Sequence, residues 1–150
     1  MEPIHTKNLI IRPFEKDDLY SLFLLLSNKQ VMKYIEEPFG KDKTELFLNE
    51  NGLIDCPRIY AVTKEKDFVG YVIFHEYDSI SFEIGWILLP EYWGKGYSSE
   101  LTKALIEECQ KHNKRVVIEC DPQQIATIKI AEKYGFKLTG KRDNLLVYYL

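Results

Sequence analysis

Three strand-like runs fill the middle of this 150-residue chain with only short polar segments between them, and this arrangement constrains the fold more than any other feature. The runs span residues 59–63, 68–77 and 80–89 and are rich in β-branched and aromatic residues, as strands are. Residues 64–67 (KEKD) and 78–79 (DS) separate them and are typical turn sequences. The pattern predicts an antiparallel meander of three strands, which Pro90 ends.

Before the meander, the sequence predicts one strand and two helices. Residues 9–12 form a short β-branched run closed by Pro13, after which Asp17 and Asp18 can cap a helix. The apolar face of that helix would carry Leu19, Leu22, Phe23 and Leu26. A second helix is expected at about residues 42–51, with Leu46 directed inward and Gly52 at a left-handed C-cap.

After the meander, helices and strands alternate. A helix is expected from Ser98 or Ser99 to about residue 112, followed by a strand at 115–120 and a helix at about 123–134 that stops at Gly135. Residues at helical spacing form the apolar faces of these two helices: Leu101, Ala104, Leu105 and Cys109 in the first, and Ile125, Ile128 and Ala131 in the second. Two final strands flank residues 143–144. The order βααβββαβαββ predicts an α+β domain with a mixed, mostly antiparallel sheet flanked by helices.

Composition fits one globular domain over residues 1–150. Apolar residues make up 45% and charged residues 29%, and no stretch of Pro, Gly or Ser is long enough for a linker. The net charge of −3 argues against a nucleic-acid partner, since such partners are bound by clustered Lys and Arg. No run of about 18 apolar residues could span a membrane, and the N-terminus lacks a signal core. The three cysteines lack metal-ligand spacing and are an odd number, so no disulfide framework or metal site is expected and a cytoplasmic location is predicted.

The segment from Trp93 to Ser98 (WGKGYS) lies between a predicted strand and a predicted helix. Its two glycines let the backbone turn sharply and approach a ligand closely. The helix that follows adds about half a positive charge and unpaired N–H donors at its N-terminus, which favours phosphate. Neither a P-loop nor a dinucleotide fingerprint matches, because Ser99 stands where a third glycine would be needed. The loop is therefore a candidate pyrophosphate site, and a glycine turn without any ligand is the alternative.

At this point the sequence resembles the GNAT superfamily of acetyl-coenzyme A dependent N-acetyltransferases, and most closely the branch of the ribosomal-protein N-terminal (RimJ/RimL-like) acetyltransferases. The resemblance rests on residues 83–86 (EIGW), on 90–100 (PEYWGKGYSSE), and on 121–122 (DP) followed by 132–136 (EKYGF). These motifs stand at the separation and on the elements that the family has. The predicted element order also matches along almost the whole chain.

The resemblance implies that acetyl-coenzyme A is the acyl donor. The backbone N–H groups of residues 94–98 would hold its pyrophosphate, and its pantetheine arm would lie where the strand ending at residues 87–89 splays from the strand at 115–120. A bulge near Ile87 would free N–H and C=O groups for the pantetheine amides and for the oxyanion of the tetrahedral intermediate. The cofactor-binding residues predicted in this way are Ile87, Leu88, Leu89, Trp93, Gly94, Lys95, Gly96, Tyr97, Ser98, Gln124 and Thr127.

The resemblance also implies two catalytic residues. Glu83 is the first choice of general base, because the family often keeps an acidic residue there; the alternative is a solvated carboxylate or one paired with a nearby lysine. Glu119 is the second choice. Ala131 stands where many members have the tyrosine that protonates the leaving thiolate, and Thr127 matches the serine that the ribosomal-protein branch uses instead. An exposed helix threonine without a catalytic role is the alternative for Thr127, and Tyr134 is interpreted as a packing residue.

The sequence departs from the family at several positions. Gln124 replaces the usual asparagine, Trp93 replaces the usual arginine or glutamine, and the loop between the last two strands is short. No cysteine has a histidine partner in the motifs, although Cys120 lies near the predicted cleft, so a covalent mechanism is not expected. A lone histidine such as His75 is interpreted as a surface or packing residue.

The sequence thus predicts an enzyme that transfers an acetyl group from acetyl-coenzyme A to a primary amine by direct attack in a ternary complex. The acceptor, a small molecule or a peptide, would enter from the side of the first two helices, where aromatic residues could line its pocket. A possible homodimer is inferred from relatives. Two rival functions stay open: a non-catalytic acyl-coenzyme A binding or regulatory module, and a phosphate-binding protein for another nucleotide.

Overall fold

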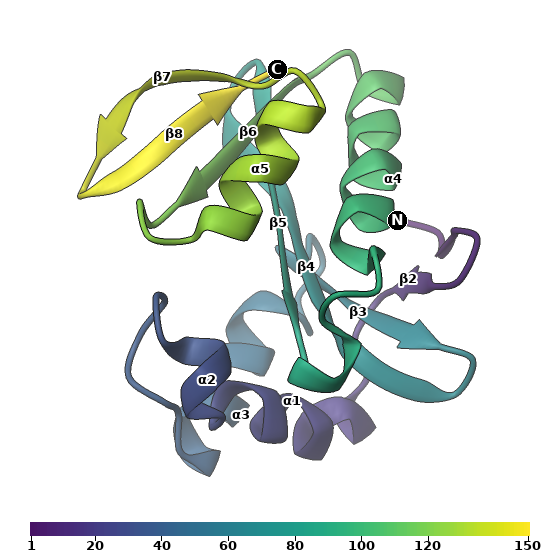
Figure 1. The fold of residues 1–150 in the computed structure, drawn as a ribbon. Coiled ribbons are helices and arrows are strands. Elements are labelled where there is room, and N and C mark those ends of the chain that lie inside the picture. The colour runs from purple at the N-terminus through teal and green to yellow at the C-terminus, as the bar shows by residue number, and fades with distance from the viewer.

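One sheet of eight strands runs through the chain in the order β1-β2-β3-β4-β5-β6-β8-β7 (Figure 1). The computed structural model describes all of residues 1–150. The strands are β1 (Ile4–His5), β2 (Ile10–Arg12), β3 (Ile59–Lys64), β4 (Asp67–Asp78), β5 (Ser81–Leu88), β6 (Arg115–Cys120), β7 (Lys137–Arg142) and β8 (Leu145–Tyr149). The helices are α1 (Leu19–Leu26), α2 (Lys29–Met32), α3 (Lys41–Asn51), α4 (Tyr97–Lys111) and α5 (Ile125–Lys133), with 3₁₀ turns at Lys16–Asp18 and Pro90–Tyr92.

The predicted α+β class and the mixed, mostly antiparallel sheet are confirmed. The meander forms β3, β4 and β5, and the last hairpin turns at Asp143 and Asn144, whose φ values of 50° and 69° suit a tight two-residue turn. Gly135 ends α5 with a φ of 89°, as predicted. None of the five helices combines the length and apolar character that a membrane crossing requires.

Five details of the prediction are wrong. The chain has an additional short strand, β1, and an additional helix, α2, whose four residues are too few to show a helical period. Leu46 is 56% exposed, because Thr44 and Leu48 form the buried face of α3. Gly52 has right-handed φ and ψ values of −103° and −36°. Helix α4 begins at Tyr97, before the predicted start at Ser98 or Ser99, and its N-cap is Gly96 in a left-handed conformation.

Two apolar cores lie on opposite faces of the sheet. A cluster of 19 buried residues packs α4 and α5 against one face, and a cluster of 11 packs α1, α2 and α3 against the other. β5 contributes to both, because Ile84 and Leu88 belong to the first cluster and Ile87 packs against the second. In Figure 1, α4 and α5 lie beside the upper part of the sheet, and α1 to α3 gather at its lower end.

The central strands β5 and β6 stop pairing early. They are the only parallel pair, and their register extends from Ser81↔Arg115 only to Glu83↔Val117. β5 continues to Leu88 while paired with β4 alone, and β6 continues to Cys120 while paired with β8 alone. The expected splay between these strands is therefore present, and Glu83 lies where it begins.

Polar contacts join the N-terminal part of the chain to helices α1 and α4. Arg12 at the end of β2 makes two 2.8 Å bonds to Asp18, which also accepts the Glu15 N–H and so joins the sheet to α1. Glu100 in the first turn of α4 accepts hydrogen bonds from Thr6 and Asn8. Burial by itself would raise the pKa of each of these two carboxyls, but their hydrogen-bond donors outweigh it and hold both below the ordinary values.

Candidate active site

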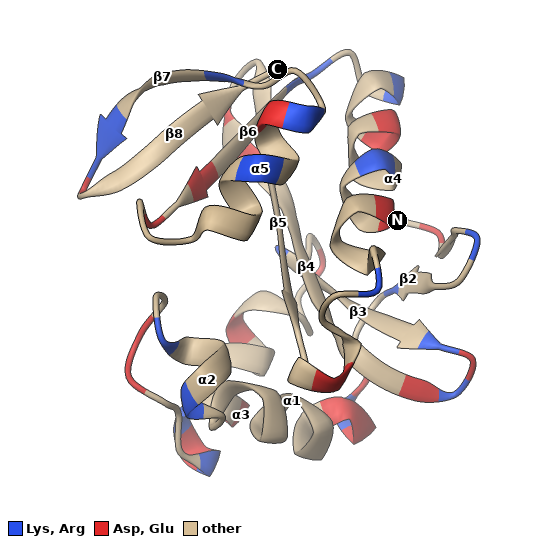
Figure 2. Cartoon of the chain, in the orientation of Figure 1, with Lys and Arg blue, Asp and Glu red and all other residues tan.

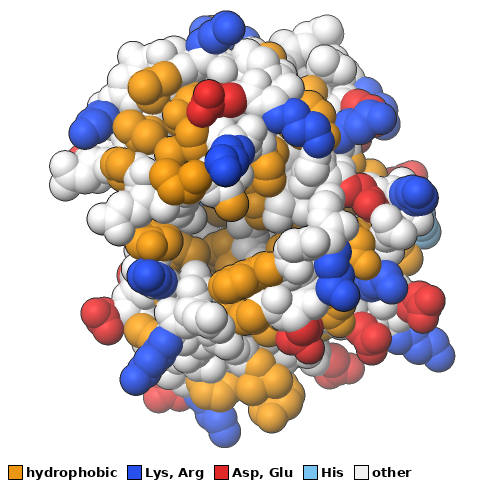
Figure 3. All heavy atoms as spheres, viewed as in Figure 1, with side chains coloured by type: hydrophobic (Ala, Val, Ile, Leu, Met, Phe, Trp, Pro, Cys, Tyr) orange, Lys and Arg blue, Asp and Glu red, His pale blue; other side chains and the backbone are white.

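A cavity of about 800 Å³ lies between the free edge of β5, the loop that follows it, α5 and the segment after α2. Figure 3 shows apolar side chains around this hollow, between the upper and lower parts of the molecule. Nine of the predicted cofactor residues line it: Ile87, Leu88, Trp93, Gly94, Gly96, Tyr97, Ser98, Gln124 and Thr127. Leu89, Lys95 and Glu83 do not line it. The structure thus brings most of the predicted set together around one cavity.

The loop before α4 presents unpaired donors to this cavity. Gly94 and Gly96 have φ values of 71° and 81°, and a Cβ atom added at either would meet no heavy atom within 4 Å. Glycine is therefore favoured there by backbone conformation rather than by space. The first helical bond of α4 runs from Glu100 N–H to Gly96 O, and Gly96 has no side chain to cap the helix. The N–H groups of Tyr97 and Ser98 consequently have no acceptor in the protein.

Trp93 holds this loop against the strand. Its Nε1–H donates to the Leu88 carbonyl at 2.8 Å, although its side chain is 46% exposed. The contact fixes the distance between the end of β5 and the glycine turn. Trp93 thus serves as a link between loop and strand.

The backbone of β5 offers further unpaired groups to the cavity. Leu89 N–H donates to Val69 O at 2.9 Å, so Leu89 uses its donor on β4. Because successive strand residues direct their backbone groups to opposite sides, those of Ile87 also point to β4, and those of Trp86 and Leu88 point to the open side. The predicted bulge near Ile87 is wrong, since the register with β4 is unbroken there. The splay alone frees the groups of Trp86 and the N–H of Leu88, whereas the Leu88 carbonyl accepts from Trp93 Nε1–H.

Three other contacts fix the elements around the cavity. Gln124 closes the turn before α5 by accepting the Asp121 N–H through Oε1 at 2.8 Å. Tyr134 lies 2.9 Å from the Ser99 hydroxyl and donates to the Ser99 carbonyl, so it joins α5 to the first turn of α4 and is a packing residue as predicted. The Thr127 hydroxyl has no hydrogen-bond partner, unlike Thr102 in α4, which donates to the carbonyl one turn earlier. Thr127 is thus free to bond a ligand.

Glu83 is paired with a histidine, not with a lysine. Its Oε2 lies 2.8 Å from His75 Nε2, and the two residues face each other across β4 and β5. Their side chains are only 19% and 13% exposed. Glu119, the second candidate base, accepts a 2.8 Å hydrogen bond from the Tyr77 hydroxyl. Both candidate carboxylates therefore already have a protein partner on the same face of the sheet.

Cys120 is a poor nucleophile in this structure. It is 2% exposed, and burial followed by the nearby charge of Asp121 raises the pKa of its thiol to about 11. The thiolate is the nucleophilic form, so little of it is present at neutral pH. This agrees with the expectation that no covalent enzyme intermediate forms.

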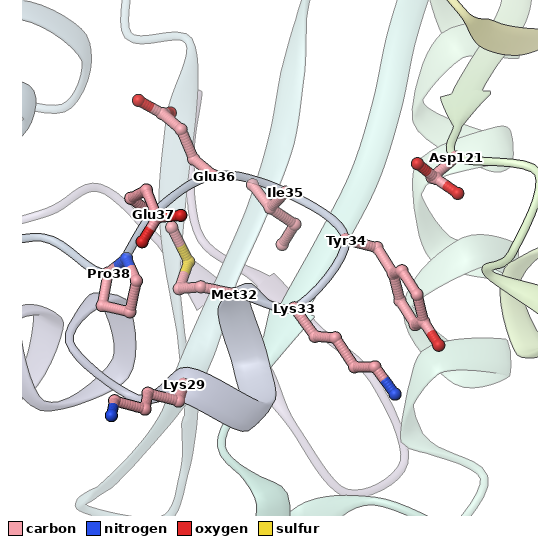
Figure 4. A pocket seen from close by; sticks show the side chains of 9 residues that line it. All are labelled: Lys29, Met32, Lys33, Tyr34, Ile35, Glu36, Glu37, Pro38 and Asp121. Atoms are coloured by element: carbon pink, nitrogen blue, oxygen red, sulfur yellow. The ribbon is translucent and has the colours of Figure 1, made fainter.

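A second cavity of about 510 Å³ adjoins the first and shares Lys33, Tyr34 and Ile35 with it. It lies between the segment after α2 and Asp121, which follows β6, and Figure 4 shows Asp121 on a separate element, beyond Tyr34. Its charged lining residues are Lys29, Lys33, Glu36, Glu37 and Asp121. Figure 2 shows the basic and then acidic stretch of the loop after α2. Sequence reasoning missed the lining role of Asp121 and Glu36, because only the fold brings these segments together.

Comparison with known proteins gives consistent results. A family model described as "Acetyltransferase (GNAT) domain" matches residues 8–137. The uncharacterized N-acetyltransferase YnaD of Bacillus subtilis is 32% identical over 144 residues, which cover 91% of this chain and 84% of that protein. Spermidine N(1)-acetyltransferase of Escherichia coli is 28% identical over 144 residues, covering 87% and 74%.

Solved structures share the whole fold. The acetyltransferase (GNAT family) from Bacillus anthracis has a TM-score of 0.86 at 29% identity, covering 99% of this chain and 97% of that one. RimL, a ribosomal L7/L12 alpha-N-protein acetyltransferase solved with coenzyme A, has a TM-score of 0.84 at 20% identity, covering 99% and 97%. Apart from the additional β1 and α2, the element order predicted from the sequence is the order of this fold.

Proposed function

The chain belongs to the GNAT acetyltransferase family, and we propose that it transfers an acetyl group from acetyl-coenzyme A to a primary amine by direct attack in a ternary complex. One observation carries the proposal: the 800 Å³ cavity has the unpaired N–H groups of α4 at one end and the free edge of β5 along its side. A phosphate at a helix N-terminus and an extended amide chain beside a strand edge are the two ligand parts that suit these features.

Acetyl-coenzyme A would use both features. Its pyrophosphate would accept hydrogen bonds from the N–H groups of Tyr97 and Ser98, within the positive end of the helix dipole. Its pantetheine amides would pair with the N–H and carbonyl of Trp86 and with the N–H of Leu88, which face the open side of β5. Lys95 is an exposed residue of the loop before α4. It adds positive charge there but does not line the cavity.

The reaction needs one proton to be removed from the acceptor ammonium and one to be delivered to the leaving thiolate. In the proposed mechanism Glu83, directly or through one water, takes a proton from the acceptor ammonium, and the neutral amine attacks the thioester carbonyl. A backbone N–H on the open edge of β5 stabilises the oxyanion of the tetrahedral intermediate. Its collapse breaks the C–S bond, and Thr127 donates the proton that the thiolate needs. Asp121 and Glu119 are the alternative bases.

The acceptor would occupy the second cavity, on the side of α2. We propose a cationic amine of small-molecule or peptide origin, because three carboxylates line this space against the two ammonium groups of Lys29 and Lys33. Glu36 already pairs with Lys43, which leaves Glu37 and Asp121 as the carboxylates for the acceptor. The spermidine acetyltransferases among the relatives support including polyamines among the candidates.

We also propose that the protein works in the cytoplasm and forms a homodimer. All three cysteines are free, which suits a reducing compartment. Light scattering of the purified protein tests the second point, since a homodimer has twice the 17.7 kDa mass of the chain.

The experiment that tests the proposed function is thiol release from acetyl-coenzyme A with a panel of polyamines, peptides with free N-termini, aminoglycosides and amino acids. Release above a no-acceptor control with one class would support the enzyme and identify its acceptor. No release with the whole panel, together with a melting temperature raised by acetyl-coenzyme A, would favour the non-catalytic binding module. A melting temperature raised by adenosine nucleotides and not by coenzyme A would favour the nucleotide-binding alternative.

Variants separate the catalytic assignments. Glu83→Gln, Asp121→Asn and Glu119→Gln each remove one candidate base, and loss of a general base lowers kcat by roughly 100-fold or more. Thr127→Ala should lower kcat with little change in acetyl-coenzyme A affinity, whereas Thr127→Ser keeps the hydroxyl and serves as its control. A Thr127→Ala enzyme as active as wild type would remove Thr127 from the mechanism.

A further inference from the structure

The pair formed by His75 and Glu83 is built by a register shift in the sheet. Pairing between β4 and β5 starts at Asp78↔Ser81 and shifts by one residue between Glu76 and Asp78. Without that shift, Glu76 would stand opposite Glu83, and two like charges would face each other. With it, His75 stands opposite Glu83 and the two side chains bond at 2.8 Å. The bulge therefore determines the partner of the proposed base.

The hydrogen bonds of His75 fix where its protons are. Nδ1 lies 2.8 Å from the Glu76 carbonyl, which can only accept, so Nδ1 carries a proton. Nε2 faces a carboxylate oxygen that, when ionised, also only accepts. The 2.8 Å contact therefore needs a second proton between Nε2 and Oε2. When that proton leaves, two lone pairs face each other and Glu83 loses its hydrogen bond.

A guanidinium lies beside the pair and can bond His75 when that proton is absent. Arg58, just before β3, places Nη2 3.4 Å from His75 Nε2 and can donate to it once Nε2 is unprotonated. Farther along the same face, Tyr77 of β4 donates to Glu119 of β6, and the Arg142 guanidinium of β7 lies 5.5 Å from the Tyr77 ring centre. Glu119 is thus occupied by its own partners, and the nearest cation to His75 is Arg58.

We propose that His75 is a positioning residue that controls Glu83 through one shared proton, an inference that rests on the proposed function. With the proton present, Glu83 is held in an ion pair with the imidazolium and accepts no proton from the acceptor. With the proton lost to solvent, Nε2 accepts from Arg58 and Glu83 is a free carboxylate. His75 thereby couples the availability of the base to pH.

The transfer step then balances without a further reactant. An N–H bond of the acceptor ammonium breaks and an O–H bond forms on Glu83; the amine electron pair forms the C–N bond as the carbonyl pair moves to oxygen. The C–S bond breaks as the carbonyl re-forms, and the thiolate takes the proton of the Thr127 hydroxyl. The nitrogen of the new amide then gives one proton to the Thr127 oxygen and restores the hydroxyl. Glu83 returns its proton to solvent. One ammonium and one thioester give one amide, one thiol and one released proton.

The test compares His75→Gln with wild type over a range of pH, using one acceptor throughout. Glutamine can still donate to Glu83, but it does not titrate. The ratio of kcat/KM between variant and wild type should stay near one at high pH and rise by about threefold or more at low pH, where wild-type Glu83 is held by imidazolium. The intrinsic titration of the acceptor amine cancels in this ratio.

Two controls isolate the effect. His112 in the exposed end of α4 lies 3.6 Å from Glu108, away from both cavities, so His112→Gln should give a ratio that does not change with pH. In the Glu83→Gln background, adding His75→Gln should likewise leave the residual rate without a new pH dependence. A pH-independent ratio for His75→Gln in the wild-type background would overturn the proposal while leaving the transferase intact.

A second readout does not depend on turnover. Nitrogen NMR of the His75 ring should show the neutral form protonated on Nδ1, as the Glu76 carbonyl requires. A neutral form protonated on Nε2 would overturn the proposal, whatever the activity. A wild-type protein that acetylates no amine would instead overturn the proposed function, and this inference with it.

Discussion

Replacing Gly70 by alanine should damage the 800 Å³ cavity from the far side of the strand that lines it. Gly70 of β4 stands directly opposite Leu88 of β5. A Cβ atom there would lie 2.1 Å from the Ile87 carbonyl oxygen and 2.8 Å from the Leu88 Cα. Both are backbone atoms that no rotamer change can move, so the end of β5 would have to retreat by about 1 Å to reach ordinary contact distance.

The magnitude follows from two terms. Overpacking of this kind costs about 1–3 kcal/mol in free energy of unfolding. Movement of β5 also strains the 2.8 Å bond from Trp93 to the Leu88 carbonyl, a hydrogen bond worth about 1 kcal/mol. The expected loss of stability is therefore roughly 2–4 kcal/mol. Because the same movement shifts the open edge of β5, the Kd for acetyl-coenzyme A should rise by about tenfold or more.

Gly85→Ala is the matched control, since Gly85 lies in the same pair of strands. Its Cβ would meet only the Ile73 side chain, with the Cδ1 atom at 3.2 Å, and that side chain can rotate. The variant should stay within about 1 kcal/mol of wild type and bind acetyl-coenzyme A normally. Urea unfolding and calorimetric titration measure both quantities. Equal stability and equal affinity of the two variants would refute the reasoning about β5.

Three further variants test contacts that support the site. Asp18→Asn leaves the Arg12 guanidinium without its bidentate partner and should cost about 2–3 kcal/mol in urea unfolding; a loss below about 0.5 kcal/mol would contradict it. Hydrogen-bond partners lower the pKa of Asp18 and of Glu100 in the folded state. Both carboxylates therefore stabilise the fold at pH values above their unfolded-state pKa of about 4, and this stability is lost as the pH falls through their folded-state pKa. The Asp18→Asn, Glu100→Gln double variant should thus show a flatter dependence of stability on acidic pH than wild type, and equal slopes would be inconsistent with this account. Trp93→Phe removes the bond to the Leu88 carbonyl and should weaken acetyl-coenzyme A binding about fivefold in calorimetry, whereas unchanged affinity would show that the loop holds its place without it.

The meander and the final hairpin could be predicted because their signals are local. Strand-like runs between polar turns gave β3, β4 and β5, and the residues at the last turn accept positive φ angles. Helix α2 was missed because its four residues hold less than two turns of periodic pattern. The inward position of Leu46 was wrong because three consecutive apolar residues, Leu46, Phe47 and Leu48, do not define which of them faces the core. Thr44 is fully buried there, and its hydroxyl donates to the Gly40 carbonyl.

The glycine turn before α4 was also predictable, whereas the partner of Glu83 was not. Gly94 and Gly96 could be identified from the sequence because glycine permits the left-handed φ values that this turn has. The His75 and Glu83 contact depends on a one-residue bulge, and counting back from the turn would have put Glu76 opposite Glu83 instead. The second cavity is lined by residues almost 90 positions apart in the sequence, such as Tyr34 and Asp121. A local sequence pattern cannot predict that such distant residues line one cavity.

The central claim is tested most directly by intact-mass measurement of both acceptor and protein after incubation with acetyl-coenzyme A. The account expects one acetyl group on the amine nitrogen of the acceptor and none on the protein, at any time during turnover. An acetyl group trapped on the protein, on Cys120 or elsewhere, followed by its transfer to the amine would contradict direct attack. An unmodified acceptor across every amine class would contradict the proposed transferase itself.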